Sequence, residues 1–201
     1  MTTTRCHWAG DDPLYIRYHD TEWGVPNTDD LKLFEKLVLE GFQAGLSWIT
    51  ILRKREHFRK VFDGFNPEKI VRYTPAKQAA LMADPGIVRN KLKIEATIDN
   101  AKAYLKLAET HSLAHLLWDI AGGKPQQNSV AVKASMLAET PTSKAMSKAL
   151  KSHGFRFVGP TTVYAFMQSM GMVNDHFVDC PQHAACAKLA AKFKLPKAKP
   201  L

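Results

Sequence analysis

Two pairs of potential metal ligands lie at opposite ends of this 201-residue chain, and they constrain its fold more than any other feature. Cys6 and His19 lie near the N-terminus, and His176 and Cys180 lie near the C-terminus. Cysteine thiolate and neutral imidazole are ligands that Zn²⁺ prefers, and four of them in a tetrahedron form a closed structural site. If both pairs bind one ion, segments roughly 160 residues apart (positions 19 and 176) are fastened together.

The residues alone leave other arrangements open. His176 and Cys180 are four residues apart, so one helical turn would place both on the same face. Cys186 and His183 compete as ligands, and His7 neighbours Cys6. Buried cysteines and surface histidines without a metal would produce the same pattern. A catalytic zinc needs an open coordination position and a nearby base, and nothing in the sequence favours that arrangement.

Composition limits the class of protein. Hydrophobic residues make up 45% of the chain, which is enough for a core, and no apolar run approaches the roughly 18 residues of a membrane span. The N-terminus lacks a secretory signal, so we expect a cytoplasmic protein with no membrane partner. Three cysteines then favour metal binding or free thiols over disulfides. No heptad pattern or exposed apolar stripe indicates more than a monomer.

The net charge of +9 favours a polyanionic partner, most simply nucleic acid. Part of this excess lies in residues 188–199, which mix Lys with Ala and Pro. We expect that segment to be a solvated, partly frayed tail. Charge alone therefore supports nucleic-acid binding only weakly.

Hydrophobic periodicity predicts an all-α protein without internal repeats. Residues 1–28 are expected to be mostly loop with short helical turns, and residues 155–158 are the only strand candidate. The first expected helix begins at Asp30, is capped by Thr28 or Asp29 and is interrupted at Gly41 and Gly45, and a second runs from about Ser47 through 53–55. Two short helices are expected within 70–82, and longer ones over 87–107 and 113–121. A further helix is capped by Thr142 or Ser143 and stops at Gly154, and the last runs from Pro160 to about Gly171. Residues 124–140 are expected to be loop or broken helix.

Residues 81–87, Leu-Met-Ala-Asp-Pro-Gly-Ile, join two of these helices and have the layout of a helix-hairpin-helix. Turn amides around Gly86 and the start of the next helix could point N–H groups at a phosphate, and Arg89 and Lys91 add positive charge. A plain turn between helices is the alternative. The motif's usual second glycine is replaced where Val88 and Arg89 lie.

Glu40 follows the apolar run 37–39 and precedes Gly41. An acid among apolar residues is costly to keep ionised unless it is paired, so Glu40 either faces solvent or serves as an acceptor at the floor of a pocket. Five aromatic residues lie on both sides of it in the sequence: Trp8, Tyr15, Tyr18, Trp23 and Trp48. They could belong to the core, or they could form a stacking slot that favours a cationic base.

Together these segments resemble the 3-methyladenine DNA glycosylase I family, the constitutive bacterial alkylation-repair glycosylases of the helix-hairpin-helix superfamily. The stretches that carry the resemblance are 5–8, 12–16, 18–26, 39–50, 154–159 and 173–176, within roughly residues 5–181. The resemblance implies an all-α, helix-hairpin-helix glycosylase-like fold with two closely packed helical lobes. A single domain would span 1–186, with the hairpin lobe around 60–140, followed by a basic tail over 187–201.

The resemblance also implies one structural Zn²⁺ per chain, held by Cys6, His19, His176 and Cys180. It implies binding of double-stranded DNA that contains alkylated bases, flipping of the damaged nucleotide, hydrolysis of its N-glycosidic bond, and release of free 3-methyladenine. Glu40 matches the acid that contacts the flipped base, Tyr18 and Trp48 match the stacking walls, and Trp8, Tyr15 and Trp23 lie in or near the pocket. Gln43, Gly45 and Leu46 match the wedge that fills the gap in the duplex, and the hairpin at Gly86, with Arg89 and Lys91, would grip the backbone.

A mechanism follows from the chemistry of the substrate. N3-methylation gives adenine a positive charge and makes it a good leaving group, so we expect little acid catalysis. Tyr18 and Trp48 would sandwich the base while Glu40 accepts a hydrogen bond from its amino group. No motif places a lysine beside this acid, so we expect no Schiff base and no strand cleavage. Asp99 is the nearest candidate for a general base, but it is typical of the polar face of a helix.

Two other classes remain as alternatives. A non-catalytic helix-hairpin-helix DNA-binding module with structural zinc would bind any duplex in a salt-sensitive way and would be indifferent to Glu40→Gln. A zinc hydrolase would lose turnover on chelation without unfolding, whereas loss of a structural ion would loosen the fold first.

Overall fold

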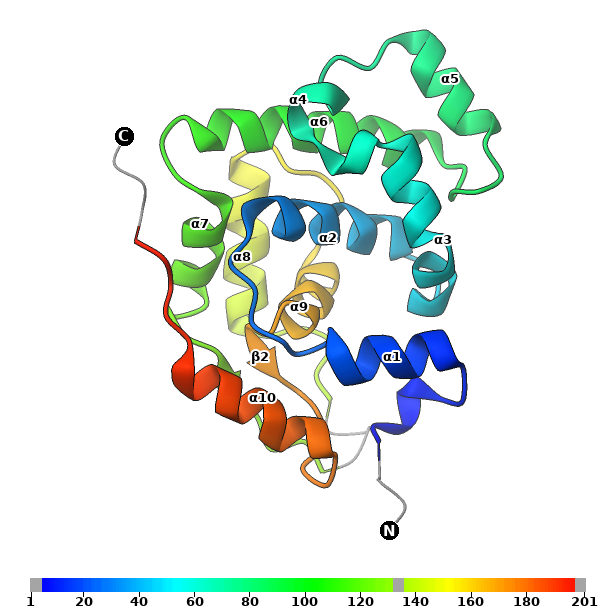
Figure 1. Ribbon diagram of the computed structural model, residues 1–201. Helices are drawn as coiled ribbons and strands as arrows, with labels where there is room; N and C mark the ends of the chain where they lie inside the picture. The colour runs from blue at the N-terminus through cyan, green and yellow to red at the C-terminus, as the bar shows by residue number, and fades with distance from the viewer. Residues whose placement is uncertain (1–4, 132–135, 198–201) are drawn as a thin grey trace.

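The protein is described by a computed structural model that covers residues 5–131 and 136–197. Within these residues it is almost entirely helical (Figure 1). The described α-helices are α1 (Pro13–Thr21), α2 (Asp30–Gln43), α3 (Trp48–Val61), α4 (Pro67–Ile70), α5 (Pro75–Ala83), α6 (Lys91–Ala108), α7 (Leu113–Ile120), α8 (Pro141–Ser152), α9 (Pro160–Ser169) and α10 (Pro181–Lys192). Two 3-10 turns, η1 (His7–Ala9) and η2 (Asp63–Phe65), and two short strands, β1 (Gln126–Gln127) and β2 (Val173–Asn174), complete them.

Helix α2 lies at the centre of the molecule and packs against α3, α6, α7 and α9 (Figure 1). Its first turn is stabilised by Asp29, whose carboxylate accepts hydrogen bonds from the backbone N–H groups of Leu31 and Lys32. Apolar residues recur every three or four positions, so the helix buries an almost continuous surface. One connected apolar cluster extends from α1 to β2, and α2 supplies a large part of it.

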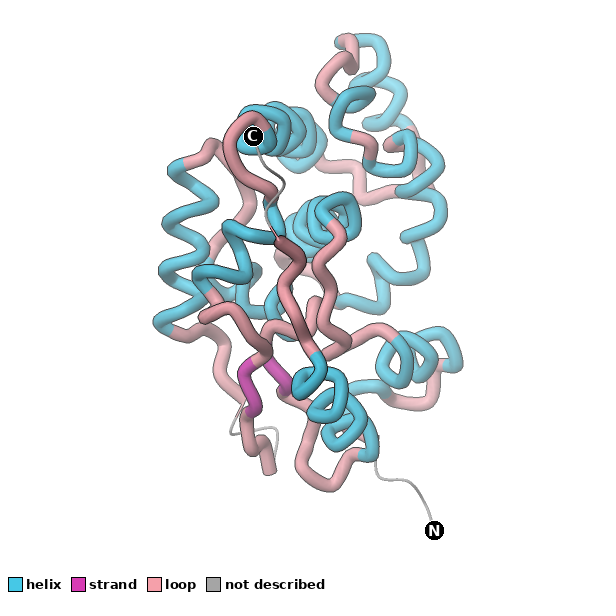
Figure 2. Tube along the Cα trace, turned by 60° about the vertical axis from the view of Figure 1, so that its left-hand side comes forward, coloured by secondary structure: helices cyan, strands magenta, loops and turns pink. Residues whose placement is uncertain are grey.

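The two strands bring distant segments together beside the N-terminal region. β1 and β2 pair in parallel, with Gln126 opposite Val173 and Gln127 opposite Asn174 (Figure 2). The pairing continues in an isolated bridge between Val130 and Phe177. A second, smaller apolar cluster forms here around Cys6, Val130, Phe177 and Cys180. The segment that follows β2 is therefore held against the residues that precede α1.

Helices α5 and α6 form the expected hairpin, and α3 fixes its turn. Asp84 Oδ1 accepts a hydrogen bond from the Gly86 N–H at 2.7 Å, and Asp84 Oδ2 lies 2.8 Å from His57 Nε2. Lys54 donates to the carbonyl of Pro85 at 2.7 Å. A Cβ atom on Gly86 would lie 2.2 Å from the His57 ring, so this turn requires glycine for close packing. The Gly86 N–H is already occupied by Asp84.

The all-α prediction is confirmed, but several local predictions are wrong. Residues 13–21 form helix α1 in place of the expected loop, because Asp12 caps Leu14 and Tyr15 and Pro13 occupies the first helical position. Helix α2 continues through Gly41, whose missing side chain allows contact with Phe157. Helix α6 begins at Lys91 and not at residue 87, because the Asn90 side chain caps it.

Two further corrections concern the C-terminal half. Helix α8 is capped by Thr140 through a capping box with Ser143, so neither Thr142 nor Ser143 is its cap. Residues 155–158 do not form a strand. Backbone groups of two of these residues pair with side chains: the Arg156 backbone exchanges hydrogen bonds with the Asn100 side chain, and Ser147 donates to the Val158 carbonyl.

The expected tail differs from the structure as well. Helix α10 extends to Lys192, and the Phe193 ring packs on Trp118 with a centroid separation of 4.2 Å. An apolar anchor therefore follows the basic helix, whereas residues 198–201 of the predicted tail lie outside the described residues. Among the helices described here, none has the length and apolar character that a membrane span requires.

Candidate functional site

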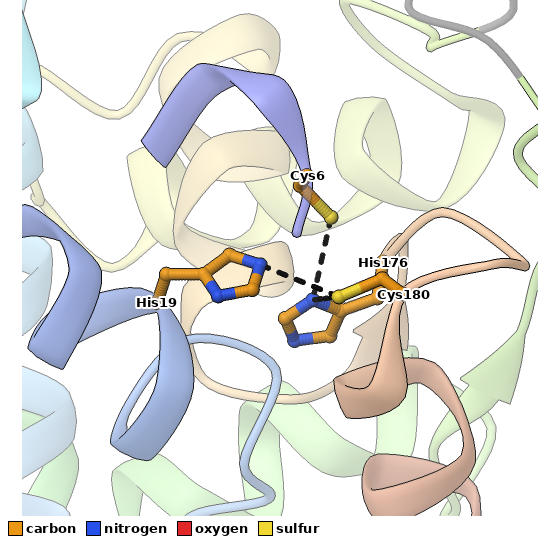
Figure 3. A group of neighbouring side chains, drawn as sticks. All are labelled: Cys6, His19, His176 and Cys180. Carbon is orange, nitrogen blue, oxygen red and sulfur yellow. Dashed lines mark hydrogen bonds between the residues drawn. The ribbon is translucent and has the colours of Figure 1, made fainter. Parts of the chain in front are cut away.

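The four predicted metal ligands come together in one buried cluster. Cys6, His19, His176 and Cys180 are all buried, and one ligand atom from each lies within 4.8 Å of the others (Figure 3). The spacing of His176 and Cys180 suggested that both could lie on one face of a helix, but in the structure they do not. Both lie in the turn that follows β2, and Cys180 is the residue that precedes α10. The third cysteine, Cys186, is buried in α10 outside this set.

The distances fit a tetrahedral ion. Cys6 Sγ lies 3.6 Å from His176 Nδ1, and Cys180 Sγ lies 3.6 Å from His19 Nε2 and 3.9 Å from His176 Nδ1. Bond lengths of about 2.3 Å to sulfur and about 2.0 Å to nitrogen place tetrahedral sulfur and nitrogen ligands about 3.5 Å apart. The donor set and its geometry therefore fit a closed Zn²⁺ site with no open coordination position.

The second ring nitrogen of each histidine has its own partner, which orients the first. His19 Nδ1 lies 2.7 Å from Asp20 Oδ1, so Nε2 is directed at the cluster. His176 Nε2 lies 3.0 Å from the Trp23 carbonyl oxygen, so Nδ1 is directed at the cluster. Burial lowers the pKa of His176 to about 4, which keeps its imidazole neutral and able to bind a metal. Such outer partners are typical of metal-binding histidines.

An aromatic group connects this cluster to a cavity. The Trp8 ring contacts His19, Tyr15 and Trp23, at centroid distances of 5.1, 5.2 and 4.9 Å. Trp23 in turn contacts His176 at 4.6 Å, with the two rings nearly perpendicular. Side chains of the metal cluster are therefore packed directly against side chains that line the cavity.

The cavity has a volume of about 250 Å³ and a mostly apolar, aromatic lining. This is below the roughly 300 to 1,000 Å³ of pockets that hold drug-sized ligands, so it suits a small planar ligand. Its lining residues are Trp8, Tyr15, Tyr18, Trp23, Glu40, Gln43, Trp48, Met136, Ala165 and Gln168. All five aromatic residues singled out in the sequence are among them, together with Glu40 and Gln43. Met136, Ala165 and Gln168 were not predicted.

Glu40 is 3% exposed and lies at the wall of the cavity, not on a solvent-facing surface. Its Oε1 accepts from the ammonium group of Lys36, one turn earlier on α2, at 3.0 Å. Lys36 also donates to the Tyr18 hydroxyl at 2.9 Å, and its Nζ lies 3.2 Å from the centre of the Trp48 ring. The expectation that no lysine accompanies this acid is therefore wrong. An i, i+4 pair on a mostly apolar helix was the signal in the sequence.

Three buried polar atoms in this part of the molecule have no hydrogen-bond partner. They are Glu40 Oε2, Trp8 Nε1 and Trp48 Nε1, and they are the complete set of such side-chain atoms among the described residues. All three residues line the cavity. Because an unpaired buried polar group costs about 1 to 3 kcal/mol, unpaired groups gathered at one cavity indicate a ligand with complementary donors and acceptors.

The expected sandwich between Tyr18 and Trp48 does not fit this geometry. Their ring centroids are 5.4 Å apart and the rings are tilted by 42°. A base stacked between two rings needs a separation of about 7 Å, twice an aromatic contact distance. The two rings instead contact each other and form one continuous wall.

The remaining predicted residues lie at three separate places. Residues 43–46 form a tight turn between α2 and α3, in which Gly45 has a φ of +81° and Leu46 is 42% exposed. Gln43 lies beside Glu40 in the cavity lining. Arg89 and Lys91 are exposed at the start of α6, next to the hairpin. Asp99 lies on the outer side of α6, where it pairs with Arg156 and Lys102.

Comparisons with known proteins agree with this geometry. The family model described as methyladenine glycosylase matches residues 8–183. DNA-3-methyladenine glycosylase of Haemophilus influenzae is 51% identical over 180 residues, which cover 89% of this chain and 97% of that protein. A crystal structure of 3-methyladenine DNA glycosylase I superposes with a TM-score of 0.87 at 47% identity, covering 89% of this chain and 98% of the other. A tyrosine-to-phenylalanine variant of 3-methyladenine DNA glycosylase I, in complex with 3-methyladenine, gives a TM-score of 0.86 at 37% identity, with coverage of 89% and 97%.

Proposed function

This chain belongs to the methyladenine glycosylase family, and on that premise we propose that it removes N3-methyladenine from alkylated double-stranded DNA. The enzyme hydrolyses the N-glycosidic bond of the damaged nucleotide after flipping it out of the duplex. Free 3-methyladenine is the product. The observation that carries this function to the residues of this chain is the set of unpaired polar atoms at the aromatic cavity.

The flipped base lies against the wall formed by Tyr18 and Trp48, on the side of these rings that faces the cavity. Glu40 Oε2 accepts a hydrogen bond from the exocyclic amino group of the base, the indole N–H of Trp8 is a donor for a ring nitrogen of the base, and the in-plane N–H of Trp48 is a donor for an ordered water at the edge of the base. This placement replaces the sandwich. It is supported by the position of all four residues at one cavity, with Tyr18, Glu40 and Trp48 buried and Trp8 partly buried, and by the lack of protein partners for these atoms.

Catalysis in this scheme requires little proton transfer to the base. N3-methylation already makes the purine a cationic leaving group, so the main tasks of the protein are to hold the extruded base and to stabilise its charge. A carboxylate at the cavity wall serves both tasks, because its negative charge favours the cationic lesion over a neutral purine.

Two exposed features serve to bind the duplex. Leu46, at the tip of the 43–46 turn next to the cavity lining, is the side chain that fills the gap left by the flipped nucleotide, with Gln43 and Gly45 shaping the turn. The hairpin at Gly86 approaches the backbone, and Arg89 and Lys91 contribute the non-specific attraction to phosphate. Because the Gly86 N–H is bound by Asp84, charge rather than this amide carries the contact.

The cluster of Cys6, His19, His176 and Cys180 holds one structural Zn²⁺ per chain. Its closed four-ligand geometry and its complete burial support a structural role. The ion supplies positive charge that stabilises the buried thiolates, which matters because burial raises the pKa of Cys6 to about 12. It also fastens the turn after β2 to α1, which carries Tyr15 and Tyr18.

The test is base release from methylated duplex DNA, with products separated by chromatography. The native chain should release 3-methyladenine and leave 7-methylguanine in the DNA. Glu40→Gln, which keeps the shape of the side chain, should reduce the rate of release about 10- to 100-fold, because a hydrogen bond to a charged group contributes about 1.5 to 3 kcal/mol. Glu56→Gln, at an exposed position on α3, is the matched control and should retain the native rate.

The outcomes separate the alternatives. No release by a folded, zinc-loaded native chain would leave only the DNA-binding module. Equal release by the native chain and by Glu40→Gln would keep the enzyme but remove the role of the carboxylate. Loss of turnover on chelation with the fold intact would favour the zinc hydrolase.

A further inference from the structure

Lys36 is a buried cation directly behind the cavity wall. It is 8% exposed and lies on α2, one helical turn before Glu40. Its ammonium group contacts three residues from three different helices: Glu40 on its own helix, Tyr18 on α1 and the ring of Trp48 on α3. Lysine is rarely buried in this way without a specific set of partners.

These contacts give the two carboxylate oxygens of Glu40 different surroundings. Oε1 accepts from Lys36 at 3.0 Å, whereas Oε2 is buried and unpaired. Because both residues stand on one rigid helix, the ion pair fixes the rotamer of the carboxylate and leaves Oε2 as the free acceptor. Lys36 also donates to the Tyr18 oxygen, so the hydroxyl hydrogen of Tyr18 is left to point elsewhere.

The charges around Lys36 come from each element packed against it. Burial lowers the pKa of Lys36 to about 8, and the attraction of Glu40 opposes that shift. Arg55 on α3 acts in the same direction as burial, and Glu22, which is paired with Arg55 at the end of α1, opposes it. At neutral pH the lysine is therefore mainly protonated.

We propose that Lys36 is a positioning residue for base excision: its ammonium group keeps the Glu40 carboxylate ionised and directs Oε2 toward the base. This inference rests on the proposed function. Removing one partner of a buried ion pair leaves the other charge uncompensated, and a buried carboxyl group then favours its protonated form. Lys36 does not touch the base in this scheme, because it lies behind the rings of Tyr18 and Trp48.

The position of Lys36 also defines which side of Trp48 is available. With Nζ 3.2 Å from the ring centre, one face of the indole already carries a cation–π contact. The base can use only the opposite face. The ammonium group therefore holds the Trp48 ring of the cavity wall in place as well as the Glu40 carboxylate.

The experiment is the pH dependence of base release under single-turnover conditions, from about pH 5.5 to 9, a range that spans the titration of a carboxyl group with a raised pKa. Four proteins are compared: native, Lys36→Met, Glu40→Gln and the double variant. Methionine keeps the length and the apolar stem of the side chain and removes its charge. Lys32→Met, at an exposed position one turn earlier on α2, is the matched control. Spontaneous loss of the base from the DNA is measured at each pH and subtracted.

Lys36→Met should shift the acid limb of the profile to higher pH, because protonation of Glu40 becomes easier without the cation. Loss of an opposite charge raises the pKa of a carboxyl group by about 1 to 3, so from an ordinary value of about 4.3 release at about pH 6 should fall by up to about 20-fold, with recovery toward the native rate near about pH 9. In the Glu40→Gln background the same substitution should change the rate by less than about twofold, since the effect acts through the carboxylate.

Three results would overturn the proposal. One is an equal loss at every pH, which indicates a purely structural role. The second is a Lys36→Met effect of the same size in the Glu40→Gln background and in the native background. The third is loss of the fold in both Lys36→Met and Lys36→Gln, judged by thermal unfolding and zinc content. If the native chain releases no 3-methyladenine, the proposed function fails and this inference with it; if Glu40→Gln is fully active, only the inference and the role of Glu40 fail.

Discussion

The buried ammonium group of Lys93, on α6, binds backbone carbonyl groups at the C-terminal end of α2. Its removal allows a quantitative test of the fold around the cavity. Lys93 is 8% exposed and donates to the carbonyl oxygens of Phe42 at 2.8 Å and of Ala44 at 2.7 Å. Lys93→Met keeps the apolar stem but removes both donors. The Phe42 carbonyl, in a buried residue, is left unpaired at about 1 to 3 kcal/mol, whereas the exposed Ala44 can bind water instead.

The expected loss of stability is about 2 to 3 kcal/mol. Burial lowers the pKa of Lys93, and relief of this desolvation cost offsets part of the lost hydrogen bonding, so the estimate stays below the sum of two charged hydrogen bonds at about 1.5 to 3 kcal/mol each. At about 2 to 4 °C per kcal/mol for a chain of this size, the melting temperature should fall by about 4 to 12 °C. Base release should also slow, because one of these carbonyl groups lies within the 43–46 turn and the other lies directly before it.

Guanidinium unfolding monitored by circular dichroism measures the effect through the midpoint at constant slope. Lys102→Met is the matched control on the same helix. Lys102 is exposed and pairs with Asp99 at 3.3 Å, a surface ion pair worth less than about 1 kcal/mol. If Lys93→Met and Lys102→Met are destabilised by the same amount within about 0.5 kcal/mol, the buried ammonium does not stabilise the end of α2 and the reasoning is refuted.

Further predictions follow from the same contacts. Elemental analysis should find one zinc per chain, and Cys180→Ala should lose the metal and lower the melting temperature; a metal-free native chain of unchanged stability would contradict this. Gly86→Ala should destabilise the fold by about 1 to 3 kcal/mol, and adding His57→Ala should recover most of the loss, as measured in a double-mutant cycle. Leu46→Ala should reduce excision from duplex DNA while leaving unfolding midpoints unchanged. Borohydride should trap no covalent complex with DNA, because Lys36 lies behind the aromatic wall; a trapped adduct would show a lyase step.

The helices are predictable to the extent that local signals determine them. Hydrophobic periodicity locates α2, α3, α6 and α9 because each buries an apolar face. The errors occur where one residue is compatible with two structures. Asp12 with Pro13 is typical of loops, yet the same pair caps and starts α1. Glycine at position 41 predicts a break in the helix. In the structure the helix is continuous there, and the close approach of Phe157 is the reason for the glycine. This contact is long-range, so no local pattern could distinguish the alternatives.

The composition of the site is predictable, but its geometry is not. Glu40 and the aromatic residues are candidates by their types and neighbours, and all of them line the cavity. The orientation of Trp48 relative to Tyr18 depends on how α3 packs against α1, which the sequence does not reveal. Lys36 is visible at i−4 from Glu40 on an apolar helix, and weighing that pair would have predicted an internal counter-ion.

Helix α1 links the two parts of the site. His19 lies at the metal cluster, whereas its neighbour Tyr18 and Tyr15 one turn earlier line the cavity. Trp8 packs on His19 and Trp23 packs on His176, so aromatic cavity residues contact both histidines of the cluster. A structural ion of the kind proposed for this cluster would therefore influence activity without taking part in the reaction, by holding α1, and with it one wall of the cavity, against α2 and α3. Because the indole rings are packed on the ligands themselves, small movements of the cluster reach the cavity without any flexible connection between them.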